Sequence, residues 1–150
     1  MQVELEPAKL TDLPEISALC LRSKAYWGYD AAFMAACEDE LTLRPEDLSD
    51  HLIFARNGTV LVGTVCVIPN GPDAELAHLY IDPPFIGRGL GRKLFDWAGK
   101  AARKTGAARL VIIADPNAAS FYTAMGANLM GESKSGSIPG RMLPQFEYSL

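Results

Sequence analysis

The stretch "YIDPPFIGRGLGRKLF", Tyr80–Phe95, decides the fold, because glycines at three alternate positions separate an apolar run from a helix-like run. Successive glycines let backbone N–H groups turn inward around an anion, and the helix that follows adds the positive end of its dipole. The stretch is not a dinucleotide fingerprint, because Arg92 stands where the last glycine of G-x-G-x-x-G belongs. It is not a P-loop either, since Arg92 and Lys93, rather than Lys and Ser or Thr, follow Gly91. It therefore predicts a site for an anion such as a diphosphate, or else a tight strand-to-helix connector.

The segments on both sides of this loop predict an α/β domain with a mixed sheet. Asp12 and Glu15 resemble a capping box at the start of a first helix, and Asp30 is placed to cap a second. Two Asn-Gly pairs between apolar runs predict hairpins, because both residues tolerate positive φ. The predicted elements are strands at 2–8, 51–56, 59–69, 74–82, 109–114, 128–133 and 145–150, and helices at 11–22, 30–41, 91–106 and 116–126.

Length and composition bound the class of protein. A chain of 150 residues with 49% hydrophobic residues is expected to form one domain, residues 1–150, with its own core. A net charge of -4 argues against a nucleic-acid partner. Cys20, Cys37 and Cys66 lie in apolar contexts and are expected to be buried free thiols in a reducing compartment. Neither a secretory signal nor a membrane-length apolar run is present, so we expect a cytoplasmic protein without a membrane partner.

Two separated motifs follow one another in the order that is found in a known protein family. The strand "ELAHLYID", the loop "FIGRGLGRKLF", a helix, the strand "RLVIIA" and then "DPNAASFYTAMGA" resemble the acetyl-CoA-binding core of the GNAT superfamily of acyl-CoA N-acyltransferases. The resemblance spans roughly residues 75–131. It implies an α/β fold with a mixed, mostly antiparallel central sheet flanked by helices and splayed between the fourth and fifth strands. It also implies acetyl-CoA (coenzyme A) as co-substrate.

The same resemblance assigns the residues that bind coenzyme A. The family's Gln/Arg-x-x-Gly-x-Gly/Ala turn binds the diphosphate, and the backbone at the end of the preceding strand contacts the pantetheine arm. Ile86 stands where the family usually has Gln or Arg, so weaker binding is expected. Asn117 resembles the family's asparagine near the arm, with a helix cap or turn as the alternative. The resemblance thus gives as binding residues Leu79, Tyr80, Ile81, Ile86, Gly87, Arg88, Gly89, Leu90, Gly91, Arg92 and Asn117.

Catalysis by aminolysis of a thioester requires a free amine and a proton for the departing thiolate. By resemblance Tyr122 is the acid that protonates the thiolate; the alternative is a packing aromatic. The general base is open between His78 and Glu75, and a structural, hydrogen-bonded histidine is the alternative for His78. Strict alternation in this strand would place Glu75 and His78 on opposite faces of the sheet.

The acceptor side is expected to come from the connector between the first two helices. Tyr26, Trp27, Tyr29 and Phe33, with acidic residues nearby, would suit a cationic amine, or they pack the two helices together. The loop "SGSIPGRMLP", Ser135–Pro144, would border the acceptor pocket, with Arg141 available for a substrate carboxylate, or would form an interface.

These expectations together describe an N-acetyltransferase that moves an acetyl group from acetyl-CoA to a primary amine by direct attack in a ternary complex. A small-molecule amine is the expected partner, with a protein amine as one alternative and a non-catalytic acyl-CoA sensor as another. No cluster has metal-ligand spacing, so no metal is expected. Relatives of this family are often dimers, which makes a homodimer possible by resemblance.

Overall fold

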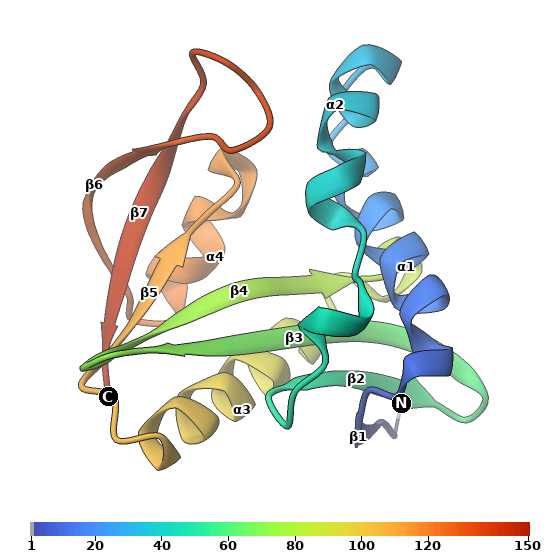
Figure 1. Ribbon diagram of the computed structural model, residues 1–150, viewed down its shortest axis with the longest axis horizontal. Coiled ribbons are helices and arrows are strands. Elements are labelled where there is room, and N and C mark those ends of the chain that lie inside the picture. Colours follow the sequence, from blue (N-terminus) through green and yellow to red (C-terminus); the bar gives the residue numbers. More distant parts are fainter. Residues whose placement is uncertain (1) are drawn as a thin grey trace.

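The computed structural model describes residues 2–150 as one seven-stranded sheet with helices packed against it (Figure 1). The strands are β1 (Glu4–Pro7), β2 (Leu52–Asn57), β3 (Val60–Asn70), β4 (Asp73–Ile81), β5 (Arg109–Ile113), β6 (Asn128–Lys134) and β7 (Met142–Ser149). The helices are α1 (Leu13–Ala25), α2 (Ala31–Leu41), α3 (Leu90–Lys104) and α4 (Ala119–Ala124), with short 3-10 turns η1 (Leu10–Asp12), η2 (Pro45–Asp47), η3 (Pro83–Phe85) and η4 (Pro116–Ala118).

The sheet is splayed in its middle. Its strand order is β1-β2-β3-β4-β5-β7-β6, and all neighbours are antiparallel except β4 and β5. The parallel pairing of β4 with β5 covers only Asp73 to Glu75, and beyond it the two strands diverge (Figure 1). The backbone of β4 after Glu75 therefore faces a gap on that side, which confirms the predicted fold and the predicted position of the splay.

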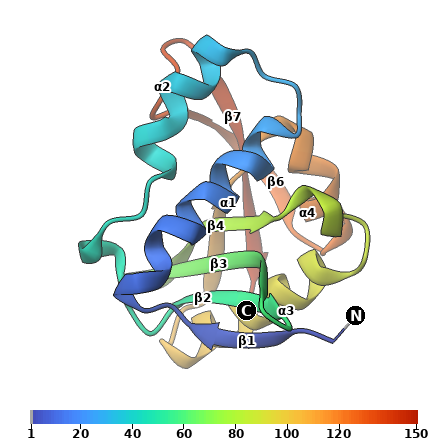
Figure 2. The same cartoon turned by 90° about the vertical axis from the view of Figure 1, so that its right-hand side faces the viewer.

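Helices cover both faces of the sheet and divide the core in two. α3 and α4 pack on one face around Leu94, Phe95 and Phe146. α1 and α2 pack on the other face around Ile16 and Leu19, and Figure 2 shows α1 lying across β3 and β4. The predicted apolar stripes of α1 and α3 are buried, as expected for amphipathic helices.

The start of α1 differs from the prediction. The Asp12 carboxylate accepts a hydrogen bond from the Lys9 amide, at 2.8 Å, and so closes η1 instead of capping α1. Asp12 itself has helical φ and ψ, because the chain passes directly from η1 into α1. The Asp30 prediction is confirmed: its carboxylate accepts from the Phe33 amide at 2.8 Å.

The two hairpins exist as predicted, but their turns are shifted by one residue. Asn57 and Asn70 are still paired in the sheet, with Val60 and with Asp73. A glycine therefore takes the first turn position in both hairpins. In the first hairpin this residue is Gly58, which has a φ of 63°. A glycine in this position is typical of a type II′ turn, so asparagine is not required to adopt positive φ.

A β-bulge in β4 overturns the predicted alternation. His78 pairs with Cys66 and Leu76 pairs with Val67, so Ala77 is an extra residue in β4. Leu76 before the bulge and Leu79 after it both contact the core on the α3 side. Glu75, His78 and Tyr80 consequently share the other face, where strict alternation had separated Glu75 from His78.

The three cysteines are buried, as predicted. Burial raises the pKa of the Cys20 thiol to about 12 and that of Cys66 to about 11. These thiols therefore stay protonated and behave as small apolar side chains. None of the helices described between residues 2 and 150 combines the length and apolar character of a membrane span.

Candidate active site

A cavity of about 790 Å³ lies where β4 and β5 diverge. Its walls come from β4, from α1 and α2, from the loop before α3, from the β5–α4 turn and from the β6–β7 loop. The predicted site residues that border it are Trp27, Glu75, His78, Leu79, Tyr80, Ile81, Ile86, Gly87, Gly89, Gly91, Arg92, Asn117, Tyr122 and Arg141. Tyr26, Tyr29, Phe33, Arg88 and Leu90 do not border it.

The glycine loop forms one end of the cavity and leads into α3. Gly87 and Gly89 have φ of 83° and 82°, a region that side chains strongly disfavour. Gly89 is the N-cap of α3, so the amides of the first helical turn, from Leu90 on, have no partner within the helix. Together with Arg92 they make an electropositive pocket suited to a diphosphate.

Neighbouring side chains explain the shape of this loop. A Cβ on Gly91 would lie 3.0 Å from Cε1 of Phe121, so glycine allows α3 to approach α4 closely. Ile86 is 39% exposed and offers the anion no donor side chain. The Arg88 guanidinium lies over the Phe85 ring, 5.4 Å from its centroid, and not in the cavity.

His78 is a neutral imidazole with one defined tautomer. Thr64 donates its hydroxyl hydrogen to the carbonyl of Ile53 at 2.9 Å, so its oxygen must accept from His78 Nε2 at 3.1 Å. The proton therefore resides on Nε2, and Nδ1 keeps its lone pair. Burial lowers the pKa of His78 to about 4, which keeps this form at neutral pH.

Two tyrosines also line the cavity. Tyr122 is 7% exposed and packs between Phe121 and Phe146, and burial raises the pKa of its hydroxyl. Burial, with Cys20 and Tyr122 nearby, likewise raises the pKa of Tyr80. Both side chains are therefore protonated donors. The sequence assigned only the backbone of Tyr80 a role, although this residue lines the cavity.

A polar cluster joins three segments that are far apart in the sequence. The Asp115 carboxylate accepts from Lys24 Nζ at 2.6 Å and from the Tyr29 hydroxyl at 2.8 Å. The Tyr29 oxygen accepts from the Arg141 guanidinium at 2.7 Å and from the Asn117 amide at 3.0 Å. We call Lys24, Tyr29, Asp115, Asn117 and Arg141 the clasp, because it ties the α1–α2 connector to the β5–α4 turn and to the β6–β7 loop.

The clasp shifts the pKa values of two of its members, Asp115 and Tyr29, in opposite directions. Burial favours the neutral carboxyl of Asp115, but hydrogen bonds from Lys24 and from the Asn117 amide outweigh it, so the pKa of Asp115 is lowered. Burial and the hydrogen bond to Asp115 raise the pKa of Tyr29. Sequence reasoning missed both Lys24 and Asp115, since only the folded chain brings residues 91 positions apart together.

The predicted aromatic wall has a different arrangement from the one expected. Tyr26 and Trp27 are 52% and 42% exposed and meet edge to face, and of the two only Trp27 borders the cavity. Tyr29 and Phe33 are stacked, with centroids 4.0 Å apart. Arg141 lies within 5.1 Å of both ring centroids, so these rings contact a cation of the chain itself.

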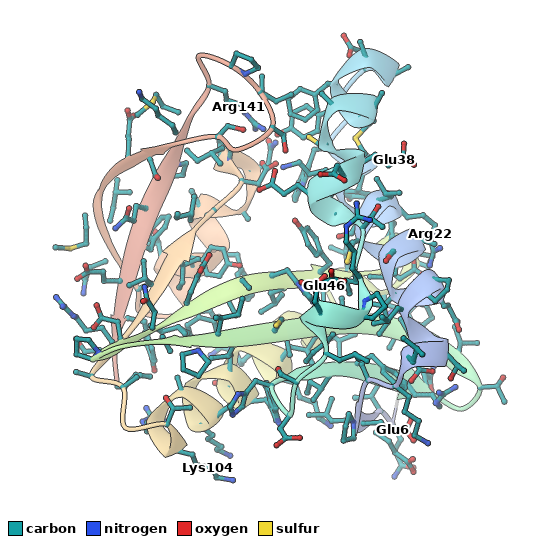
Figure 3. All side chains as sticks on the ribbon, in the orientation of Figure 1. Glu6, Arg22, Glu38, Glu46, Lys104 and Arg141 are labelled. Atoms are coloured by element: carbon teal, nitrogen blue, oxygen red, sulfur yellow. The ribbon has the colours of Figure 1, made fainter. Side chains whose placement is uncertain are left out.

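The β6–β7 loop borders the cavity and contacts α2. Ser137 donates a hydrogen bond to the Glu40 carboxylate, and Ile138 packs against the core beneath α2. The Ser135 amide donates to the Arg141 carbonyl at 2.8 Å, which fixes the backbone from which Arg141 projects. Figure 3 shows Arg141 on the side of this loop that faces α2.

The splayed sheet and the glycine loop at the N-terminus of α3 border one cavity, as expected of an α/β protein of the acyl-transfer class. A model of the acetyltransferase (GNAT) family matches residues 16–127, and the chain belongs to this family of acyl-CoA-dependent acetyltransferases. The resemblance found in the sequence is thereby confirmed. No match was found among curated proteins.

Solved structures have the same fold. A GCN5-related N-acetyltransferase from Rhodopseudomonas palustris is 26% identical, with a TM-score of 0.82 over 100% of this chain and 97% of that one. PaiA N-acetyltransferase from Thermoplasma acidophilum, solved with coenzyme A, is 18% identical, with a TM-score of 0.79 over 100% of both chains. The ribosomal-protein-S18-alanine N-acetyltransferase from Escherichia coli is 16% identical, with a TM-score of 0.69 over 97% of this chain and 91% of that one.

Proposed function

We propose that residues 1–150 form one N-acetyltransferase domain that moves the acetyl group of acetyl-CoA to a primary amine of a small molecule. The observation that carries this proposal is the single cavity that joins the glycine loop to His78 and Tyr122 through the gap beside β4. This arrangement supports direct transfer in a ternary complex, which needs the diphosphate site, the base and the acid along one continuous path.

Coenzyme A would bind along this path. The amides that begin α3 and the Arg92 side chain hold the diphosphate, and the unpaired edge of Leu79, Tyr80 and Ile81 offers backbone groups to the pantetheine arm. The Asn117 side chain, already bonded to Tyr29 and Asp115, lies beside the arm. The PaiA structure with coenzyme A has the same fold, which supports this assignment.

The chemistry follows from the protonation states. The amine attacks the thioester carbon, Nδ1 of His78 accepts the amine's proton directly or through water, and Tyr122 donates its proton to the departing thiolate. With a pKa lowered to about 4, His78 is a weak base whose value lies in being unprotonated at neutral pH. Glu75, on the same face of β4, is the second candidate base.

A small molecule is the acceptor we favour, because the β6–β7 loop contacts α2 at the border of the cavity, through Ser137 and Glu40. The Escherichia coli relative named above acts on a ribosomal protein, so a protein amine is the alternative acceptor. A sensor that binds acyl-CoA without turnover is the second alternative, motivated by Ile86. A cytoplasmic location without nucleic-acid or membrane partners fits the charge and the buried thiols, and a homodimer stays open.

Titration with acetyl-CoA during thermal unfolding tests this function. Ligand at about 100 times its dissociation constant adds roughly 2.7 kcal/mol of stability. For a domain of this size, we expect the unfolding temperature to rise by about 5–11 °C. ATP and NAD serve as controls and should give no comparable shift. The absence of a shift at millimolar acetyl-CoA would contradict the proposal.

A further inference from the structure

The clasp holds more positive than negative charge at the edge of the acceptor cavity. Lys24 and Arg141 both pair with the single carboxylate of Asp115, at 2.6 and 3.7 Å. Their side chains are only 12% and 18% exposed, and within residues 2–150 neither forms a second ion pair. Burying a surplus positive charge is unfavourable unless an anion pairs with it. This end of the cavity should therefore favour a bound anion.

Of the two cations, Arg141 has more hydrogen-bond donors that the described residues leave unused. The Lys24 ammonium makes its short contact with Asp115, whereas the Arg141 guanidinium donates only to the Tyr29 hydroxyl among the described residues. A guanidinium carries five N–H donors in a planar fork that matches a carboxylate. Arg141 also borders the cavity, so its remaining donors are available to a molecule bound there.

The guanidinium is held in place before any ligand arrives. Phe33 and Tyr29 lie 4.8 and 5.1 Å from its central carbon, and the turn from Ser135 to Arg141 is closed by the hydrogen bond between their backbones. Preorganisation of this kind lowers the entropic cost of binding. The site is distinct from the glycine loop, which lies on the segment that leads from β4 to α3 (Figure 1).

Of the acidic side chains that line the cavity, Asp115 belongs to the clasp, and Glu75 and Glu40 lie on other elements. Glu75 is on β4, on the same face as His78, and Glu40 on α2 accepts a hydrogen bond from Ser137. An ammonium group placed beside Arg141 would be repelled by the guanidinium, whereas the Glu75 carboxylate would attract it. The cavity thus separates a place for the amine from a place for an anion.

We propose that the acceptor is an amino carboxylate, whose amine reaches His78 and whose carboxylate is bound by Arg141. This inference rests on the proposed acetyltransferase function and names its substrate class. Arg141 acts in specificity, not in the chemical step, so its removal should raise KM more than it lowers kcat. An amine without a carboxylate should react poorly and should be indifferent to the side chain at position 141.

The test measures release of the coenzyme A thiol from acetyl-CoA with L-amino acids and ω-amino acids, each compared with its own carboxamide. We expect turnover of at least one amino carboxylate, with kcat/KM at least 10-fold above that of its carboxamide. Arg141→Gln should lower kcat/KM for the carboxylate by about 10- to 100-fold and leave the carboxamide unchanged. Arg141→Lys keeps the charge but loses the planar fork of donors. Its kcat/KM for the carboxylate should lie between that of the natural chain and that of Arg141→Gln.

Controls separate this inference from the proposed function. Arg44→Gln removes an exposed arginine that pairs with Asp39 away from the cavity, and should not alter either rate. The acetyl-CoA thermal shift of Arg141→Gln should match that of the natural chain, and its own unfolding temperature reports whether it folds. Equal activity on carboxylates and carboxamides, or no turnover of any amino carboxylate despite acetyl-CoA binding, would overturn the inference. Failure to bind acetyl-CoA would instead overturn the proposed function.

Discussion

At the scale of single residues, protonation states decide what each cavity side chain contributes. Burial pushes the pKa of His78 down and that of Tyr122 up, so each is held in its neutral form. A neutral imidazole accepts a proton and a neutral phenol donates one. Loss of hydration therefore keeps the proposed base on β4 and the proposed acid on α4 in the protonation states that they need, although it makes each of them weaker.

Tyr122→Phe tests the acid role. Loss of the hydroxyl should lower kcat by about 100-fold, the lower range for a general acid, while acetyl-CoA affinity is kept because the ring still packs against Phe146. Steady-state kinetics and the acetyl-CoA thermal shift measure the two effects separately. Unchanged turnover would show that another group, with the Tyr80 phenol as the first candidate, protonates the thiolate.

His78 also makes stability depend on pH. Its pKa is about 4 in the folded chain and about 6.5 when unfolded, so the unfolded chain binds more protons between these values. Stability is therefore lost as pH falls from about 6.5 towards 4, by at most about 3 kcal/mol, and by less where cavity water reaches the ring.

His78→Gln keeps an N–H donor for Thr64 but does not titrate. We expect its urea-unfolding free energy to fall less than that of the natural chain between pH 7 and pH 4.5. Parallel pH profiles for the two proteins would show that another group causes the acid sensitivity.

At the scale of elements, the glycine loop and α3 form one unit whose backbone conformation makes the proposed diphosphate site. Gly89 at the N-terminus of α3 and Gly106 after its C-terminus have nearly the same φ, 82° and 85°, and neither has a neighbour within 4 Å of an added Cβ. Alanine at either position therefore introduces similar strain without a clash, about 1–2 kcal/mol.

Gly89→Ala should weaken acetyl-CoA binding by about 10-fold or more, because the amides that hold the diphosphate lose their alignment. Gly106→Ala should destabilise the chain to a similar extent but leave acetyl-CoA affinity unchanged. Calorimetric titration with acetyl-CoA compares the two variants. Equal affinities would mean that the diphosphate does not bind at this loop.

At the scale of the whole molecule, the clasp joins segments from the first, fourth and last fifths of the chain at the border of the cavity. Asp115 is its centre, since Lys24, Tyr29, Asn117 and Arg141 all contact this carboxylate. The lowered pKa of Asp115 adds stability above the pKa of the unfolded carboxyl, and this stability is lost as pH falls through the folded pKa.

Asp115→Asn should lower the unfolding free energy by roughly 1–3 kcal/mol at pH 7, because two cations lose their common partner. Hydrogen exchange should speed up at the amides of Ser135 and Arg141, which the loop positions beside α2. As a control, Asp39→Asn removes the exposed partner of Arg44 and should have little effect. Unchanged exchange in the loop would show that the Glu40–Ser137 contact alone holds the loop against α2.

The sequence by itself determined the elements and the class of protein. Local signals suffice for these: Asn-Gly pairs mark the hairpins, alternate glycines mark the anion loop, and the apolar stripes of α1 and α3 mark the core. The order of the motifs then pointed to the GNAT family, which the family match confirms.

Only the tertiary structure decided how the site is assembled. The extra residue Ala77 in β4 arises from pairing with β3, so the face that Glu75 and His78 share could not be read from β4 alone. The contact of Lys24 with Asp115 and the placement of Arg141 beside Tyr29 depend on the splay that opens the cavity. Periodicity and turn chemistry act over a few residues, whereas strand register and charge pairing act between segments that meet only after folding.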